Sequence, residues 1–190
     1  MHSLILHIKN YIPVEDEEYE SILQFFDTAE LKKRDTILIE GQICKANYFI
    51  VKGCLRMFFI NEKGVEQTTQ FAIENWWISD NLSLLTQKPT AFHIQAVEKS
   101  EVLSIGNSSY QKLIQLHPSI ESYFRMMHQR ALGAAQYRMK YQHGMSREEI
   151  YRFFANSFPE FIQRIPQYLL ASYLGFTPEY LSELRKKKIS

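Results

Sequence analysis

The sequence IPQYLLASYLGFTPEYLSELRKKK, residues 165–188, predicts two short helices joined by a tight turn. Pro166 suits the start of the first helix, and Leu169, Leu170 and Leu174 fall at helical spacing on one face. Gly175 follows directly, and glycine commonly ends a helix because it accepts the left-handed backbone conformation without a steric penalty. We therefore expect the first helix to end at Gly175.

The second helix of this stretch has clear start signals. Thr177 is a good N-cap, Pro178 suits the first helical position, and the helix dipole favours Glu179 in the first turn. Leu181 and Leu184 then face inward. Two short helices joined by a turn that contains glycine are typical of a helix-turn-helix. The alternative is a structural helix hairpin that ends in a solvated lysine tail.

A DNA-reading helix pair would expose the N-terminal part of its second helix to the base edges. A glutamate can accept a hydrogen bond from the cytosine amino group, and serine or threonine can bond to either class of base. Lysine and arginine at the far end can neutralise phosphates. The candidate DNA-binding residues are Thr177, Glu179, Tyr180, Ser182, Glu183, Arg185, Lys186 and Lys187.

Charge is distributed unevenly along the chain, although the net charge is only +1. Residues 1–106 hold 10 Lys and Arg against 15 Asp and Glu, whereas residues 107–190 hold 12 against 6. This separation indicates a C-terminal half that meets a polyanion. Chance is the competing explanation when charge is taken alone.

Residues from Leu31 to about Ile105 predict a β sandwich or barrel. Short runs rich in Ile, Val, Phe and Tyr alternate there with turns that contain glycine. The expected strands are 36–39, 48–51, 55–60, 67–73, 93–97 and 102–105. Segment 78–85 interrupts the pattern as a short helix or loop, which is a natural place for a ligand pocket. A short helix is expected before the strands, at 14–26.

From residue 108 onward the chain is expected to be helical, with Pro118 in the first turn of a long helix that ends at Gly144. A mostly apolar stripe along this helix consists of Ile120, Phe124, Met127, Ala131, Ala134, Arg138 and Tyr141. We expect this stripe to form a dimer seam, because the preceding β domain offers few helical partners. An ordinary helix packed on its own domain is the alternative. A capping box at 146–149 starts the next helix, which places the expected domain boundary at 144–146.

The composition is ordinary for a globular protein, with 45% hydrophobic and 23% charged residues, and this excludes a disordered chain. The apolar runs are too short to span a bilayer, and the N-terminus lacks the features of a signal peptide. Cys44 and Cys54 are the only cysteines, which excludes a disulfide scaffold and a four-cysteine metal or iron–sulfur site within this chain. We expect a cytoplasmic protein with no membrane partner, no metal site and no cofactor.

The sequence carries no pattern of a known catalytic site. It lacks the alternating strand histidines of a metal-holding jelly-roll enzyme, and it lacks Gly-x-Ser-x-Gly, P-loop and His-Glu-x-x-His motifs. The six histidines also show no pattern that singles out a haem ligand. We therefore expect no enzyme and no catalytic residue.

Together these segments resemble the Crp/Fnr family of bacterial transcription regulators. The resemblance is carried by EGQ at 40–42, YFIVKG at 48–53, NEKG at 61–64 and LIQLHP at 113–118. The long helix and the helix pair follow in the family's order and spacing, although most of the β wing that usually comes after them is missing. The implied fold class is α+β, with an N-terminal jelly roll like that of cyclic-nucleotide-binding proteins.

The resemblance also implies a division into domains and a set of partners. Residues 1–117 would form the sensor domain, 118–143 a long dimerisation helix, and 144–190 the helix-turn-helix domain. The implied function is a homodimeric transcription regulator that senses a small effector, binds a near-palindromic site in double-stranded DNA and works with RNA polymerase. The alternative is a ligand-binding or protein-interaction module that has lost sequence-specific DNA binding.

In relatives that bind cyclic AMP, a Gly-Glu pair meets the ribose, an Arg-Ser pair meets the phosphate, and a Thr-Ser pair of the long helix meets the adenine. These pairs align here with Ser79-Asp80, Thr90-Ala91 and Ala135-Gln136. Asp80 can still accept a hydroxyl, but Thr90 cannot supply the cation that a buried phosphate needs. Lys88 is a weaker candidate for that charge. We therefore expect that cyclic AMP is not the effector.

The residues around the expected pocket do not single out one effector. Trp76 and Trp77 favour a more apolar ligand or none, and they suit plain core filling equally well. The candidate pocket residues are Ser79, Asp80, Asn81, Thr90, Ala91, Ala135 and Gln136.

Overall fold

The computed structural model describes the backbone of residues 2–189 and the side chains of residues 2–186. The chain divides into two compact units. Met1–Phe59 and Gln70–Arg130 make the first unit, and Ile60–Thr69 and Ala131–Ser190 make the second. The chain therefore passes between the units three times, twice in a β hairpin and once within helix α5 (Ser119–Gly144).

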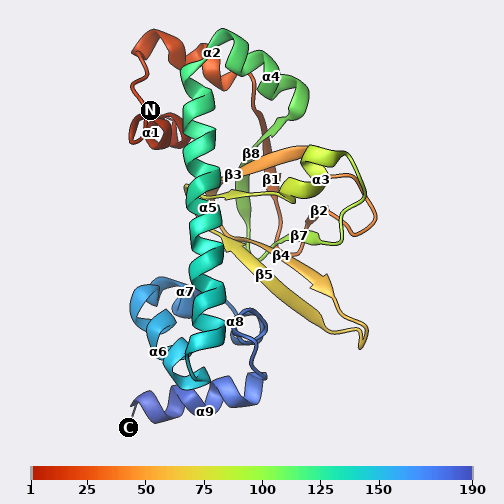
Figure 1. The fold of residues 1–190 in the computed structure, drawn as a ribbon, viewed down its shortest axis with the longest axis vertical. Coiled ribbons are helices and arrows are strands. Elements are labelled where there is room, and N and C mark those ends of the chain that lie inside the picture. The colour runs from red at the N-terminus through yellow and green to blue at the C-terminus, as the bar shows by residue number, and fades with distance from the viewer. Residues whose placement is uncertain (1, 190) are drawn as a thin grey trace. The chain divides into compact units, whose positions relative to one another are not determined.

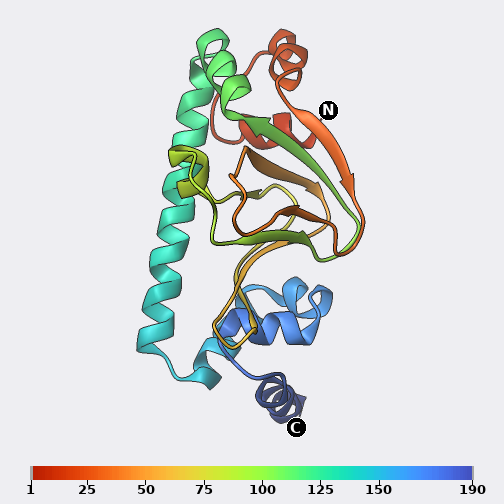
Figure 2. The ribbon, with the colours of Figure 1, turned by 90° about the vertical axis from the view of Figure 1, so that its right-hand side faces the viewer.

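Two four-stranded sheets form an antiparallel β sandwich, mostly within the first unit (Figures 1 and 2). Their strand orders are β1-β8-β3-β6 and β2-β7-β4-β5. The strands are β1 (Asp27–Leu31), β2 (Thr36–Leu38), β3 (Ala46–Lys52), β4 (Leu55–Ile60), β5 (Glu66–Ala72), β6 (Trp77–Ile78), β7 (His93–Ala96) and β8 (Ser100–Gly106). Phe49 lies opposite Leu103 in the first sheet, and Met57 lies opposite Ile94 in the second.

All six strands expected from the sequence are present, and two further strands were not expected. Strand β1 is exposed at every position except Leu31, so it lacks the alternation of apolar and polar residues that marks a half-buried strand. Strand β6 has only Trp77 and Ile78, which is too short to give a pattern. Both strands form because they pair with long neighbours, β1 with β8 and β6 with β3.

The helices of the first unit lie around the sandwich, and the second unit is mainly helical. The helices are α1 (Ser3–Lys9), η1 (Asp16–Glu18), α2 (Tyr19–Leu23), α3 (Asn81–Thr86), α4 (Asn107–Leu116), α5, α6 (Arg147–Ser157), α7 (Pro159–Arg164), α8 (Gln167–Leu174) and α9 (Pro178–Ile189). Helix α1 was not expected, and the helix expected at 14–26 is replaced by η1 and α2. The predicted capping box is confirmed, because Ser146 and Glu149 exchange hydrogen bonds at the start of α6.

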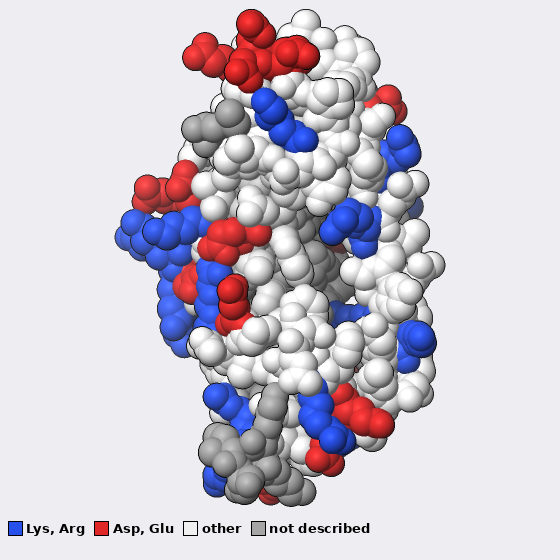
Figure 3. Space-filling view, turned by 90° about the vertical axis from the view of Figure 1, so that its left-hand side faces the viewer, with Lys and Arg blue, Asp and Glu red and all other residues white. Residues whose placement is uncertain are grey.

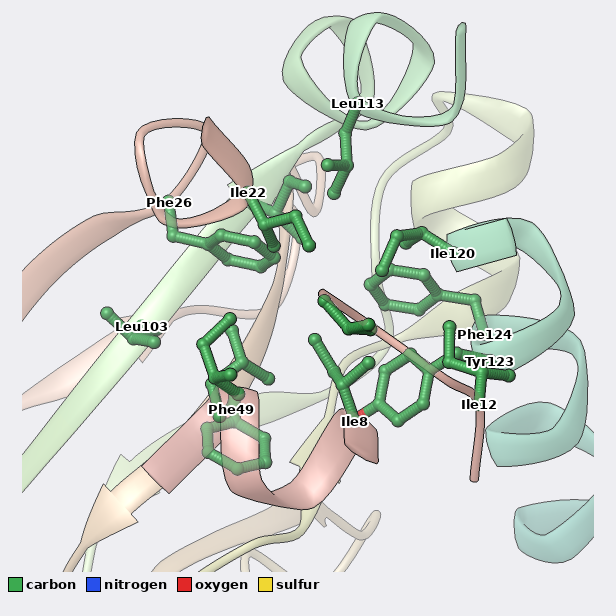
Figure 4. Packing of buried hydrophobic residues seen from close by; sticks show 14 residues of the cluster. Ile8, Ile12, Ile22, Phe26, Phe49, Leu103, Leu113, Ile120, Tyr123 and Phe124 are labelled. Carbon is green, nitrogen blue, oxygen red and sulfur yellow. The ribbon is translucent and has the colours of Figure 1, made fainter. Parts of the chain in front are cut away.

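The helices α1, α2, α4 and α5 share one hydrophobic core with the first sheet. Figure 4 shows Ile8, Ile22, Leu113 and Phe124 pointing toward one another from these four helices. Phe49 of β3 adds the contribution of the sheet to the same cluster. Each of these side chains is almost fully removed from water, and burying one of them contributes about 1.5–3 kcal/mol.

This core uses one end of the apolar stripe on α5. Ile120 and Phe124 are buried in the core of their own unit, and Met127 packs against it. Tyr141 contacts Phe153 in the second unit, with ring centroids 4.5 Å apart. Between these positions, Ala131 and Ala134 are exposed. The two ends of the stripe therefore have contacts within the chain, and the dimer seam stays a prediction. Periodicity shows that one side of a helix must be covered, but it does not show by what.

A hydrogen-bond chain fixes α1 to α5 inside this core. The indole N–H of Trp77 donates to the Tyr123 hydroxyl oxygen at 2.8 Å, and that hydroxyl lies 2.7 Å from Nδ1 of His7. The indole N–H can only donate, so the Tyr123 hydroxyl keeps its own proton for a hydrogen bond to His7. Nδ1 of His7 must then be unprotonated, so that its lone pair can accept this bond. The chain is thus satisfied by a neutral His7 with its proton on Nε2. Burial, and to a smaller degree the charge of Arg130, lowers the pKa of His7.

We predict that His7 makes the free energy of unfolding depend on pH near 6. The unfolded chain binds a proton at about pH 6.5, whereas the folded chain does so only at lower pH. Stability is therefore fully present above pH 6.5 and is lost as the pH falls toward the lowered pKa. Urea unfolding at pH 7.5 and 5.5 should show a loss of up to about 1 kcal/mol, since solvent screens a half-buried ring.

The matched control is His7→Asn, which keeps an acceptor for Tyr123 and removes the titration. Its stability should change less than that of the wild type between the two pH values. The carboxyl groups of Asp16, Glu18 and Glu149 have pKa values held below their ordinary range by hydrogen bonds, so they titrate below this window. Equal losses in both proteins would show that His7 is not the group responsible.

Candidate nucleic-acid interface and effector cassette

The turn between α8 and α9 has the geometry that the sequence predicts. Gly175 has φ +75°, and its neighbour Phe176 donates its N–H to the carbonyl of Ala171 at 2.8 Å. A non-glycine residue would be strained at this backbone conformation. Thr177 caps the next helix, because its hydroxyl oxygen accepts the N–H of Tyr180 at 3.2 Å. The chain therefore ends one helix and starts another within three residues.

The two helices pack through small and apolar side chains. Leu170, Ala171 and Leu181 are fully buried, and Leu174 and Leu184 are nearly so. Close to the turn, the Gln167 side-chain amide of α8 donates to the carbonyl of Pro178 at the start of α9, at 3.2 Å. The packing leaves α9 with one inward and one outward face.

The outward face of α9 contains most of the predicted DNA-binding residues. Thr177, Glu179, Glu183 and Lys186 are exposed, and Tyr180, Ser182 and Arg185 are half-buried. The Lys187 side chain lies outside the described residues. Glu179 sits in the first turn, where the helix dipole favours its charge.

Tyr180 and Arg147 form a contact that the sequence analysis did not predict. The Tyr180 ring meets Phe176 edge-on at 5.5 Å, which fixes its direction. The Arg147 guanidinium, at the start of α6, lies 5.8 Å from the centre of the same ring. Arg147 thus adds a positive charge beside α9. The sequence pattern indicated a role for Arg147 only as part of the capping-box segment at 146–149.

The cassette, residues 79–91, is built around the buried carboxylate of Asp80. Its Oδ1 accepts the N–H groups of Leu82 and Ser83 at 3.1 Å, which makes Asp80 the N-cap of α3. Its Oδ2 accepts the hydroxyl of Thr90 at 2.6 Å. Thr90 is 3% exposed, and its oxygen also accepts the N–H of Phe92. The two positions expected to hold a ligand therefore bind each other.

Further side chains of the cassette are also engaged internally. Ser83 donates its hydroxyl to the carbonyl of Lys88 at 2.6 Å and accepts the N–H of Cys44 at 2.9 Å. Ser79 donates to the carbonyl of Ala46 at 3.2 Å. These bonds fix α3 to strand β3 and to the loop before it. They consume the polar groups that could otherwise face a ligand.

The remaining predicted pocket residues are at the surface. Asn81 and Ala91 are exposed in the first unit, and Ala135 and Gln136 are exposed on the part of α5 that belongs to the second unit. Lys88 is exposed as well. Among the described residues, the partners of the Asp80 carboxylate are two backbone amides and one hydroxyl, with no cationic side chain.

Two other kinds of site are absent from the described residues. Residues 2–189 contain no helix that is both long and apolar enough for a membrane crossing. In the same part of the chain, no three His, Cys, Asp or Glu side chains come together as metal ligands.

Comparison with protein families gives a match that covers most of the β sandwich. Residues 28–117 match the family described as the cyclic nucleotide-binding domain. The matched segment makes up a little under half of the chain. It extends from the second residue of β1 to the end of α4, so the cassette lies within it. A search among curated proteins finds no match to the chain.

Several solved structures share the fold over most of the chain. FixK2 from Bradyrhizobium japonicum has a TM-score of 0.70 at 17% identity, over 85% of this chain and 83% of that one. A CooA mutant from Carboxydothermus hydrogenoformans has 0.70 at 15%, over 92% and 80%. CLP from Xanthomonas campestris, described as responsive to c-di-GMP, has 0.69 at 13%, over 91% of each chain. The predicted resemblance is thus confirmed for the domain and the fold.

Among the described residues, the partners of Asp80 in the cassette include no cation for the phosphate of cyclic AMP. We predict that calorimetric titration with cyclic AMP shows no binding at micromolar concentration, because the phosphate would face Asp80 without a compensating cation. A ligand at about 1,000 times its Kd stabilises the folded state by about 4.1 kcal/mol. Millimolar cyclic AMP should therefore leave the Tm unchanged. A micromolar Kd together with a raised Tm would contradict the prediction.

Proposed function

We propose that this chain is a cytoplasmic transcription regulator of the Crp/Fnr type, which binds a near-palindromic DNA site as a homodimer. The observation that carries the proposal is the outward face of α9. A tightly packed helix pair leaves Thr177, Glu179 and Glu183 exposed near the start of the second helix. This is the part of a recognition helix that reaches base edges in the major groove.

The distribution of charge supports the same assignment. Arg147 lies beside Tyr180, and Arg185 and Lys186 follow on α9, which gives positive charge near the reading face. Figure 3 shows acidic side chains gathered at the end of the first unit where Figure 1 places α2. DNA phosphates are attracted to the positive charge near α9 and repelled by the acidic side chains near α2. We assign DNA contact to the second unit for this reason.

Dimerisation is proposed through the outward face of α5. Leu132 and Met139 are 62% and 57% exposed, and they are seven residues apart, which places them on one side of the helix. The ends of the stripe predicted from sequence have contacts within the chain, whereas Leu132 and Met139 are exposed and can meet a partner. A dimer presents two α9 helices, and RNA polymerase would then be recruited beside the DNA site.

The proposed regulator senses something other than cyclic AMP, and its effector is unidentified. The Asp80–Thr90 pair supports this view, because both groups already have partners. We propose no enzyme activity. CLP, one of the similar solved structures, is described as a global regulator, in line with this assignment.

A protein-interaction module without DNA binding is the second candidate. Glu179 and Glu183 are both exposed, and they lie four residues apart on the same side of α9. Two carboxylates would repel phosphates, and they suit a basic partner protein. A single DNA-binding experiment separates the two candidates.

The experiment is selection of duplexes from a random double-stranded DNA library by the purified full chain, followed by sequencing. The proposal predicts an enriched inverted repeat, with half-sites centred about 10 base pairs apart or a multiple of this. Glu179→Ala should change base preference at one position of each half-site by about 1–3 kcal/mol, because it removes one base contact. Glu160→Ala, an exposed glutamate on α7, should select the same sequence as the wild type.

The outcomes of this selection are distinct. An enriched sequence without symmetry would overturn the dimer. Enrichment of nothing would overturn the regulator and leave the interaction module. An unchanged preference in Glu179→Ala would show that the reading face is assigned wrongly.

A further inference from the structure

The hairpin formed by β4 and β5 contributes its tip, Ile60–Thr69, to the second unit. The turn is well defined, because the Asn61 side chain accepts the N–H groups of Lys63 and Val65 at 3.0 Å. Strand β5 is the last strand in its sheet order. Its outer edge therefore presents backbone N–H and C=O groups to whatever lies beside it.

Ser172 of α8 occupies this edge in the manner of a neighbouring strand. Its hydroxyl oxygen accepts the N–H of Thr68 at 2.9 Å and donates its proton to the carbonyl of Glu66 at 2.9 Å. The N–H of one residue and the C=O of the residue two before it are the pair that an adjacent strand would use. A hydroxyl can serve both groups at once, and alanine can serve neither.

Arg138 of α5 makes a second attachment next to Ser172. Its guanidinium donates one hydrogen bond to the carbonyl of Thr69 and another, at 3.1 Å, to the carbonyl of Tyr173. It also lies 4.1 Å from the centre of the Tyr173 ring. The Tyr173 carbonyl is in the last turn of α8, where helix carbonyls lack an intrahelical partner and a cation is favoured. Lysine would bridge the two carbonyls less well and could not stack in the same way on Tyr173, because it lacks the planar fork.

These two attachments form the clamp, defined as Ser172 and Arg138 with their partners on β5 and α8. The clamp does not cover the DNA-reading surface, since Thr177, Glu179 and Glu183 are exposed while it is closed. It therefore cannot act by masking α9. What it fixes is the position of α8, and α9 follows α8 after the short turn at Gly175.

We propose that Arg138 and Ser172 are positioning residues, which set the recognition helix for its DNA site by fixing α8 to strand β5. The inference rests on the proposed function. Neither residue needs to touch DNA. Opening the clamp lets α8 and α9 adopt several positions, which weakens the binding that depends on base contacts. Binding that depends only on phosphate charge is maintained.

The test compares the affinity of the full chain for the duplex it selects with its affinity for a scrambled duplex of the same composition. Ser172→Ala and Arg138→Lys should each weaken binding to the selected duplex by roughly tenfold. Binding to the scrambled duplex should change by less than about twofold. Ser172→Thr keeps the hydroxyl and should restore the selected-duplex affinity.

Matched controls are Ser157→Ala and Arg152→Lys, which alter exposed residues of α6 by the same chemistry. Both should leave the two affinities unchanged. Circular dichroism melting verifies that each variant is folded. Arg138→Lys is mild enough to supply the answer if Ser172→Ala unfolds.

Three results would overturn the proposal. An unchanged ratio of the two affinities would show that the clamp is a structural contact only, as would a failure of Ser172→Thr to restore binding. Tighter DNA binding by the clamp variants would show that the clamp hinders the recognition helix instead of positioning it. If the wild type selects no sequence, the proposed function itself fails, and this outcome is distinct from the other three.

Discussion

One helix, α5, has to satisfy two separate cores. Its first half buries Ile120, Tyr123 and Phe124 among the helices and the first sheet of the β unit. Its second half contacts Phe153 through Tyr141 and holds strand β5 and α8 through Arg138. A substitution on the inward side of either half removes a contact that its own unit needs. The outward side, with Leu132 and Met139, is free of this requirement and is therefore the side available to a second chain.

The sequence predicted the local structure well at residues whose role depends only on their near neighbours in the chain. Gly175, Thr177 and the capping box at Ser146 each act within a few residues, and all are found as expected. The partner of the α5 stripe could not be predicted, because an apolar face has the same period whatever covers it. The attachment of Ser172 to Glu66 and Thr68 was equally inaccessible, since it joins residues far apart in the chain.

The cassette shows how position and chemistry contribute separately to a candidate site. The resemblance to cyclic AMP-binding relatives located Asp80 and Thr90, and the residue types indicated that no cation would be available. The structure adds that the two side chains satisfy each other at 2.6 Å. That contact needs a short donor at position 90 and a short carboxylate at position 80, so both departures from the pattern serve one interaction. A relative's ligand, such as the c-di-GMP in the description of CLP, therefore does not transfer to this chain through the cassette alone.

The central claim is that the outward face of α9 is the surface that meets DNA. Hydrogen exchange followed by mass spectrometry tests it directly, with the chain alone, with its selected duplex and with a scrambled duplex. The account predicts slower exchange around residues 177–184 with the selected duplex, a smaller effect with the scrambled one, and no change in η1 and α2. Slowed exchange confined to the β sandwich, or none in α9 at saturating DNA, would contradict it.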